Sequence, residues 1–235
     1  MRFSTLFPRV LIRRHIASFY FGLLFAVSIL LTNQCVSMAG QDDDPVYSGP
    51  QVDEPLPGFE IIRSYGDAAG KPVDPVAAAG DRTLVTVFFH ERTRPAFALT
   101  NLVTRMALSR RDKEPAVFPV IVFLTDDRTE TENWLKQVQG LMPTEALIGV
   151  SPDGQEGPGA LGLNRNVSLT VLVARQGKVL ANFALVQPGV EVDGPKIFQA
   201  IVAASGGGEV PPLTQFQQGR RGEQMRQGQT AAGRT

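Results

Sequence analysis

The stretch TLVTVFFHERTRPA, residues 83–96, decides how this chain folds. Its first seven residues are β-branched, aromatic or leucine, which is typical of a strand buried on both faces. Thr93 then offers a side-chain oxygen to cap a helix, and Pro95 is tolerated in a first helical turn. Apolar residues continue at helical spacing through residues 95–109. The stretch therefore predicts a buried strand that runs directly into a capped helix.

Strands and helices alternate on both sides of this stretch. Strands are expected at residues 59–65, 83–89, 118–124, 147–150, 169–174 and 179–185. Besides residues 95–109, a helix is expected behind a capping box of Thr129 and Glu132, and another at residues 197–204. The inner stripe of the helix behind that capping box is expected to be Trp134, Leu135, Val138 and Leu141. This order predicts an α/β fold, with a central mixed sheet flanked by helices on both faces, in a single domain.

Residues 1–39 have the pattern of a secretory signal peptide. An apolar run at residues 16–31 is shorter than the ~20 residues that a spanning helix prefers. The positive charges that precede this run are Arg2, Arg9, Arg13 and Arg14. Ser37 and Ala39 are small residues at the −3 and −1 positions of a signal-peptidase site, so cleavage after Ala39 is expected. We expect export, to the periplasm or out of the cell, with an uncleaved membrane anchor as the alternative.

Cleavage changes the chemistry that the chain can perform. The whole sequence has 23 basic and 23 acidic residues, and residues 40–235 keep 19 basic against 23 acidic ones, a net charge of −4. This charge argues against a nucleic-acid partner, whose phosphates need a basic surface. Cleavage also removes Cys35, the single cysteine of the sequence, and leaves His90 as its one histidine. A disulfide framework and a cysteine-based zinc site are therefore excluded.

Loose segments are expected at both ends of a folded domain that spans residues 58–205. Residues 40–57 are rich in Asp, Pro and Gly, which is typical of an acidic, disordered linker. Residues 206–235 begin with three glycines and continue as a Gly/Gln/Arg tail. The large apolar residues of this tail are Leu213, Phe216 and Met225. They are too few to offset the entropy of ordering it, so a disordered tail is expected.

Two segments of the folded domain match a family pattern. In residues 83–96, Phe88, Phe89, Glu91 and Pro95 fall on the F, W, E and P of a buried strand that runs into F-W-A-E-W-C-G-P-C. Residues 167–179 are similar to V-P-T-x-x-x-x-D-x-x-G-K-V. On these residues, and on the order of its elements, the domain resembles the thioredoxin-like superfamily in its redoxin-type form. The resemblance implies a thioredoxin-like fold.

The residues that perform thiol chemistry in that family are replaced here. Thr93 and Ala96 stand where the resemblance puts the two cysteines, and Ser168 stands where it puts the cis-proline. Disulfide exchange needs a thiolate and a resolving thiol, and peroxide reduction needs a sulfur to oxidise. We therefore argue against thiol–disulfide oxidoreductase and peroxidase activity. A trans peptide bond is expected before Ser168, because a non-proline cis bond costs ~3–4 kcal/mol.

A binding groove is predicted between the start of the helix at residues 95–109 and the Ser168 loop. Its candidate residues are Arg92, Thr93, Arg94, Pro95, Ala96, Arg165 and Ser168. Arg92 and Arg94 flank a helix N-terminus, which favours anions. The resemblance, to family members that hold extended chains beside the cis-proline loop, implies a protein or peptide partner. No catalytic residue, cofactor or metal ligand is assigned.

A rival hypothesis gives chemistry to polar residues at two strand ends. His90 and Glu91 follow one predicted strand and Asp126 and Asp127 the next, and oxygen ligands suit Ca²⁺ or Mg²⁺. Neighbours on an extended chain point to opposite faces, so His90 and Glu91 are not expected to converge. The favoured function is a binding or scaffolding module of the cell envelope without thiol redox activity. The alternatives are a metal- or water-dependent enzyme using His90, Glu91 and Asp126, and a purely structural envelope domain.

Overall fold

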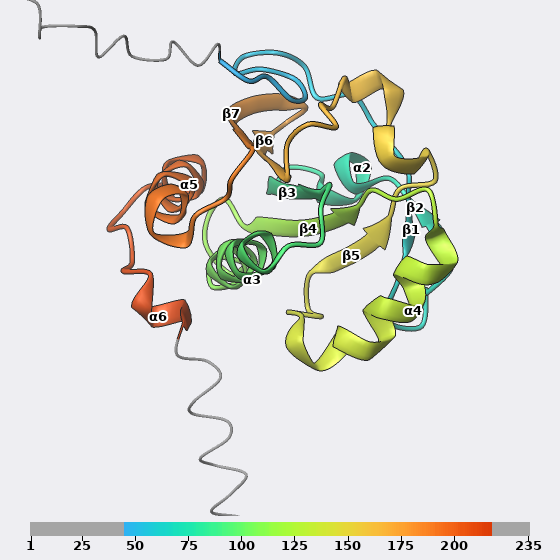
Figure 1. The fold of residues 1–235 in the computed structure, drawn as a ribbon. Coiled ribbons are helices and arrows are strands. Elements are labelled where there is room, and N and C mark those ends of the chain that lie inside the picture. Colours follow the sequence, from blue (N-terminus) through green and yellow to red (C-terminus); the bar gives the residue numbers. More distant parts are fainter. Residues whose placement is uncertain (1–44, 218–235) are drawn as a thin grey trace, which may run out of the picture. The chain divides into compact units, whose positions relative to one another are not determined.

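The computed structural model describes residues 45–217 (Figure 1). The predicted signal peptide, residues 40–44 of the predicted linker and residues 218–235 of the predicted tail lie outside the described residues. Among the helices of the described part, none is both long and apolar enough to cross a membrane.

A mixed seven-stranded sheet forms the centre of the domain, in the order β2-β1-β5-β4-β3-β6-β7 (Figure 1). The strands are β1 (Ile61–Arg63), β2 (Pro72–Val73), β3 (Thr83–Phe89), β4 (Val117–Phe123), β5 (Leu147–Val150), β6 (Leu169–Arg175) and β7 (Lys178–Leu185). Strands β3, β4 and β5 are parallel, whereas β1, β6 and β7 run antiparallel to their neighbours. The predicted mixed sheet, with a hairpin at one edge, is confirmed.

Alternate residues of β3 enter two separate hydrophobic cores. Val85, Val87 and Phe89 face one core, and Leu84 and Phe88 face the other. All seven residues of the strand are buried, because both faces of the sheet are covered.

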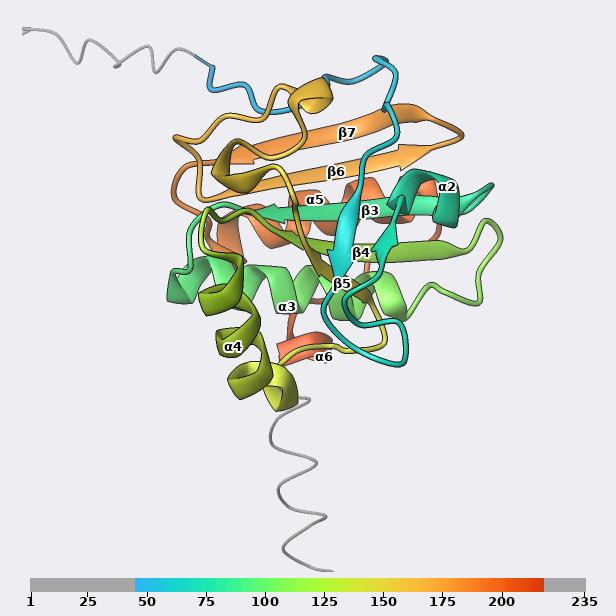
Figure 2. The same ribbon diagram turned by 90° about the vertical axis from the view of Figure 1, so that its right-hand side faces the viewer.

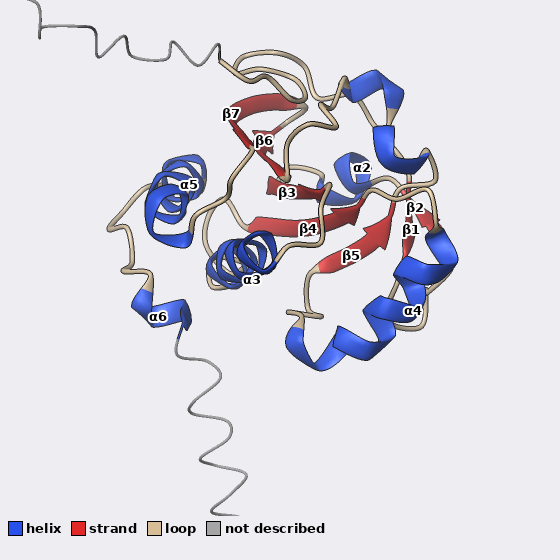
Figure 3. Ribbon diagram, viewed as in Figure 1, coloured by secondary structure: helices blue, strands red, loops and turns tan. Residues whose placement is uncertain are grey.

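The helices flank this sheet (Figure 3). The first core lies under α3 (Arg94–Leu108), α4 (Arg128–Val138) and α5 (Val190–Ala204). The chain steps from β3 to β4 to β5 in one direction across the sheet, so right-handed crossovers put α3 and α4 on the same face. The second core lies under the short α2 (Pro75–Ala79) and the 3-10 turn η3 (Gly159–Leu161). The remaining elements are η1 (Gln139–Leu141), η2 (Gly154–Glu156) and α6 (Thr214–Gln217).

Helix α4 has a different cap from the predicted one. Oδ1 of Asp127 accepts the amide of Glu130 at 2.8 Å, so Asp127 is the N-cap. Thr129 lies inside the helix and is exposed, and Glu132 pairs with Arg128 instead. The predicted capping box of Thr129 and Glu132 is wrong, because an aspartate that precedes it caps equally well and starts the helix earlier.

Helix α5 begins at Val190 rather than at residue 197. Gly194 and Pro195 lie within it, and both residues disfavour a helix locally. A Cβ on Gly194 would come within 3.0 Å of Leu213 Cδ2 and 3.4 Å of Leu102 Cδ2. The glycine therefore allows a close approach of α5 to its neighbours, and this packing outweighs the local preference.

Residues 46–57 cross the β6–β7 hairpin, and we call them the N-terminal strap (Figure 2). The amide of Asp53 donates to the carbonyl of Val179 at 2.9 Å, and the amide of Leu56 donates to the carbonyl of Gly177 at 2.8 Å. The strap thus pairs with backbone groups that the edge of the sheet would otherwise expose.

The prediction of a disordered linker is therefore wrong for the strap. The side-chain amide of Asn182 donates to the carbonyls of Ser48 and Pro50, at 2.9 and 2.8 Å. The hydroxyl of Ser48, a residue that is 1% exposed, lies 2.5 Å from that of Thr170. Composition could not reveal these bonds, since their partners lie more than a hundred residues away.

The predicted disordered tail is likewise wrong for residues 206–217. The ring of Phe216 packs edge-on against Phe198 of α5, with centroids 5.5 Å apart at 85°. Leu213 lies against Gly194 of the same helix. These few apolar residues suffice to order residues 206–217, because each contacts the surface of α5.

Candidate functional site

Helix α3 begins as the sequence predicts, at the position where the resemblance places two cysteines. Thr93 is the N-cap, and its Oγ1 accepts the amide of Ala96 at 3.3 Å. Pro95 lies in the first turn. The side chain of Ala96 is 0% exposed and belongs to the core beneath α3. At the start of α3 the hydroxyl of Thr93 is therefore engaged in capping the helix, and the methyl group of Ala96 is buried.

A groove of about 810 Å³ follows the outer face of α3, and we call it the α3 groove. Its other walls come from α4 on one side and from the start of α5 and α6 on the other. The residues of α3 that line it are Arg94, Phe97, Ala98, Asn101, Leu102 and Arg105.

The two arginines of α3 mark the two ends of one stripe. Arg94 and Arg105 are eleven positions apart, which is about three turns and ~16 Å along the helix axis. Ala98 and Asn101 lie between them on the same face. Within residues 45–217, neither guanidinium group makes an ion pair.

Aromatic rings form the wall between α3 and α4. Trp134 lies edge-on to Phe97, with centroids 6.0 Å apart, and edge-on to Phe123, with centroids 5.6 Å apart. The guanidinium carbon of Arg92 lies 5.5 Å from the centroid of the Trp134 ring, and Arg92 pairs with Glu130 at 2.6 Å. These contacts hold Trp134 in place and engage Arg92.

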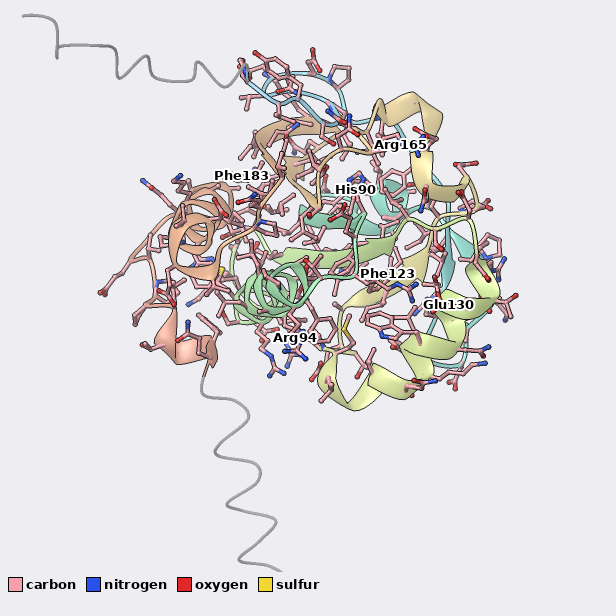
Figure 4. All side chains as sticks on the ribbon, viewed as in Figure 1. His90, Arg94, Phe123, Glu130, Arg165 and Phe183 are labelled. Atoms are coloured by element: carbon pink, nitrogen blue, oxygen red, sulfur yellow. The ribbon has the colours of Figure 1, made fainter. Side chains whose placement is uncertain are left out.

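The structure divides the predicted binding residues into two groups. Arg92, Thr93 and Arg94 line the α3 groove. The predicted residues that do not line it are Pro95, Ala96, Arg165 and Ser168. Arg94 and Arg165 lie well apart (Figure 4), and Arg165 pairs with Glu156 at 3.0 Å. The groove therefore follows α3 toward α4 and α6 instead of crossing to the Ser168 loop.

The Ser168 loop is occupied by bonds within the domain. Ser168 is 5% exposed, and its hydroxyl lies 2.9 Å from Oε2 of Glu91 and 2.9 Å from the carbonyl of Val186. Its amide donates to the carbonyl of Leu185 at 2.8 Å. The peptide bond before Ser168 is trans, as expected, and the cis bond of the described residues precedes Pro115.

His90 is held as a neutral side chain at the end of β3. Its Nε2 lies 3.0 Å from Oγ1 of Thr170, and its Nδ1 is buried with no partner among residues 45–217. Burial lowers the pKa of His90 to about 4, although the nearby carboxylate of Glu91 acts in the opposite direction. His90 and Glu91 bond to different side chains, those of Thr170 and Ser168.

The two aspartates that follow β4 also make local bonds. Oδ1 of Asp126 accepts the amide of Gln155 at 2.9 Å, and Asp127 caps α4. The described part of the chain contains no cluster of three or more metal-ligating side chains. The polar residues of the rival hypothesis therefore bond to separate partners, and the structure does not assemble them into one site.

Several residues that line the groove are not among those predicted from the sequence. Leu141, a member of the predicted inner stripe, lies in η1 beyond the end of α4, is 42% exposed and lines the groove. Phe216 fell in the predicted tail. The helical spacing of Arg94 and Arg105 is visible in the sequence and could have placed both on one face of α3. The approach of α4 and α6 to that face is not visible in the sequence.

Comparisons with known proteins identify the fold. No family model matches the chain, and no curated protein matches it. Among solved structures, the chain is similar to a thiol:disulfide interchange protein, DsbE, from Chlorobium tepidum. The two sequences are 20% identical, the match covers 68% of this chain and 99% of that chain, and the TM-score is 0.51. It is also similar to an uncharacterized conserved protein from Geobacillus kaustophilus, at 17% identity over 71% and 89%, with a TM-score of 0.52. The chain has a thioredoxin-like fold, as residues 83–96 and 167–179 predict.

Proposed function

We propose that this thioredoxin-like domain is an exported module that binds a protein or peptide in the cell envelope without exchanging disulfides. The observation that carries the proposal is the first turn of α3, where Thr93 and Ala96 replace the two cysteines. A threonine hydroxyl is a weak nucleophile unless a base activates it, and this one accepts a backbone amide. A buried methyl group cannot resolve a mixed disulfide.

The α3 groove supports binding. Its volume of about 810 Å³ falls in the range of ~300–1,000 Å³ that is usual for ligand pockets. The aromatic side chains of Phe97, Trp134 and Phe216 line it. Aromatic residues are enriched where proteins contact partners, because they bury a large area with few rotatable bonds.

Strand addition beside the Ser168 loop has less support. The amide of Ser168 donates to Leu185, and its carbonyl accepts the amides of His90 and Glu91. A peptide that adds as a strand needs free backbone groups, and these are already paired. We therefore place the partner in the α3 groove.

Export is supported by the sequence of residues 1–39, with its arginines, apolar run and cleavage-site pattern. The test is N-terminal sequencing of the protein from an envelope or culture fraction. We expect the mature chain to begin at Gly40. A chain that begins at Met1 and stays in the cytoplasmic fraction would contradict this part of the proposal.

Binding is tested with randomised peptides displayed on phage and selected on the folded protein. Ala98 is exposed and lines the groove, so Ala98→Trp fills it without disturbing the core. Ala203 is exposed on α5 and does not line the groove, so Ala203→Trp is the matched control. Peptides that bind the protein and Ala203→Trp but not Ala98→Trp support the proposal. Failure to select any peptide, or equal binding by all three proteins, would overturn it.

A further inference from the structure

We infer that the α3 groove takes an acidic linear peptide, whose carboxylates contact Arg94 and Arg105 and whose apolar side chains lie between them. The inference rests on the proposed function of the same groove and adds the chemistry of the partner.

Charge complementarity is the first argument. The chain after residue 39 has a net charge of −4, yet this groove brings together Arg92, Arg94 and Arg105. Arg92 is paired with Glu130, whereas Arg94 and Arg105 make no ion pair within residues 45–217. Opposite charge on a partner both favours encounter and selects the partner.

The carboxylate of the groove does not neutralise these arginines. Glu191 lines the wall at the start of α5, and its Oε1 accepts the side-chain amide of Gln217 at 3.1 Å. Among the described residues that line the α3 groove, positive side chains therefore outnumber negative ones. A peptide with carboxylates would complement that excess, and a basic peptide would meet like charge.

The spacing of the arginines sets the spacing of the carboxylates. About 16 Å separates Arg94 from Arg105 along the helix axis. An extended peptide advances ~3.3 Å per residue, so about five of its residues span this distance. Phe97 and Trp134 line the groove near its Arg94 end, and Phe216 lines its α6 wall. Apolar side chains of the peptide, between its acidic ends, match this arrangement.

The test uses three fluorescently labelled peptides, with anisotropy as the readout. They are Glu-Glu-Leu-Phe-Leu-Glu-Glu and the same sequence with all glutamates changed to lysine or to glutamine. We expect the glutamate peptide to bind best and to lose affinity as salt rises, because partly exposed charges are screened. The double variant Arg94→Glu/Arg105→Glu should weaken its binding by about tenfold or more, since two contacts become repulsive.

Matched variants separate local charge from general effects. Arg111→Glu/Lys113→Glu reverses the same number of charges at two exposed residues outside the groove, and should bind like the unmodified protein. Arg94→Lys/Arg105→Lys keeps the charge and should retain most of the binding. Circular dichroism and melting of each variant show that it is folded, and Arg94→Gln/Arg105→Gln repeats the test with a milder change.

Three outcomes would overturn the inference. One is equal binding of the glutamate, glutamine and lysine peptides. Another is unchanged binding by the double variant. The third is a groove that is already filled. If a second copy of the protein fills it, peptide binding should rise when the protein is diluted, and if residues 218–235 fill it, peptide binding should rise when those residues are removed. If phage selection gives peptides that Ala98→Trp excludes but that are not acidic, the proposed function stands and this inference fails.

Discussion

The hydroxyl of Ser168 lies 2.9 Å from Oε2 of Glu91, 77 positions away in the chain. This contact joins the loop before β6 to the turn between β3 and α3. The carbonyl of Ser168 also accepts the amides of His90 and Glu91. The loop that faces the start of α3 is therefore closed by bonds from within the domain, and the open surface lies along α3 instead.

Replacement of Ser168 should destabilise the domain in two steps. Ser168→Ala removes the hydroxyl and should cost about 1 kcal/mol of the free energy of unfolding. Ser168→Pro also removes the amide that donates to Leu185, and should cost at least about 1 kcal/mol more. Urea denaturation of both variants measures these losses. A proline variant as stable as the unmodified protein would show that the amide bond contributes nothing.

Cysteines at the start of α3 should create the thiol chemistry that the chain lacks. In Thr93→Cys/Ala96→Cys the two thiols lie at the N-cap and one turn later, and the helix N-terminus lowers the pKa of the first. We expect an intramolecular disulfide and, with dithiothreitol supplied as the reductant, slow catalysed reduction of insulin, at a cost of about 1 kcal/mol for the lost cap. Thr93→Cys alone is the control. Insulin reduction or peroxide consumption by the unmodified protein, above buffer, would contradict the proposed function.

Acid should destabilise the domain through His90. Its pKa is about 4 in the folded protein and about 6.5 in an unfolded chain, so between these values the unfolded chain binds the extra proton. The free energy of unfolding is therefore not reduced by His90 above pH ~6.5, and protonation of the unfolded chain lowers it by about 2 kcal/mol by pH ~5. His90→Gln keeps a hydrogen-bonding side chain without this titration. Urea unfolding at several pH values should show a smaller loss in His90→Gln, and an equal loss would refute the assignment.

The N-terminal strap should loosen when its side-chain anchor is removed. Asn182→Ala deletes the amide that donates to the carbonyls of Ser48 and Pro50. We expect a loss of about 1–3 kcal/mol, because buried carbonyls lose their partner, and faster hydrogen exchange at the amides of Asp53 and Leu56. Hydrogen exchange followed by NMR reports each amide. Unchanged protection of both would show that the backbone bonds to β7 hold the strap unaided.

Phe216 should contribute to both stability and binding, since its ring packs on Phe198 and lines the α3 groove. Phe216→Ala should lower the free energy of unfolding by about 1–2 kcal/mol, less than a fully buried phenylalanine would. Gln215→Ala, at an exposed neighbour, should change neither property. Thermal melting and peptide anisotropy provide the two measurements. A Phe216→Ala protein that melts and binds as before would exclude α6 from the domain.

Elements with a strong local pattern could be predicted from the sequence. Strand β3 has the bounds that its β-branched and aromatic run indicates, and Thr93 caps α3 as its side chain and Pro95 suggest. Helix α5 could be predicted in part, because Gly194 disfavours a helix locally and is accommodated by contact with Leu102 and Leu213. The cap of α4 was missed because Asp127 and Thr129 are both suitable residues, and propensity does not choose between them.

The sequence by itself determined the buried strands, the start of α3 and the absence of cysteine from residues 40–235, because these depend on residue type and short-range periodicity. Only the tertiary structure decided where the strap lies, that Phe216 packs on Phe198, and that Trp134 packs edge-on against Phe97 in the wall of the α3 groove. Each of these depends on contact between segments far apart in the chain. Such contacts are selected by the shape and unpaired groups of surfaces that exist once the sheet and helices have assembled.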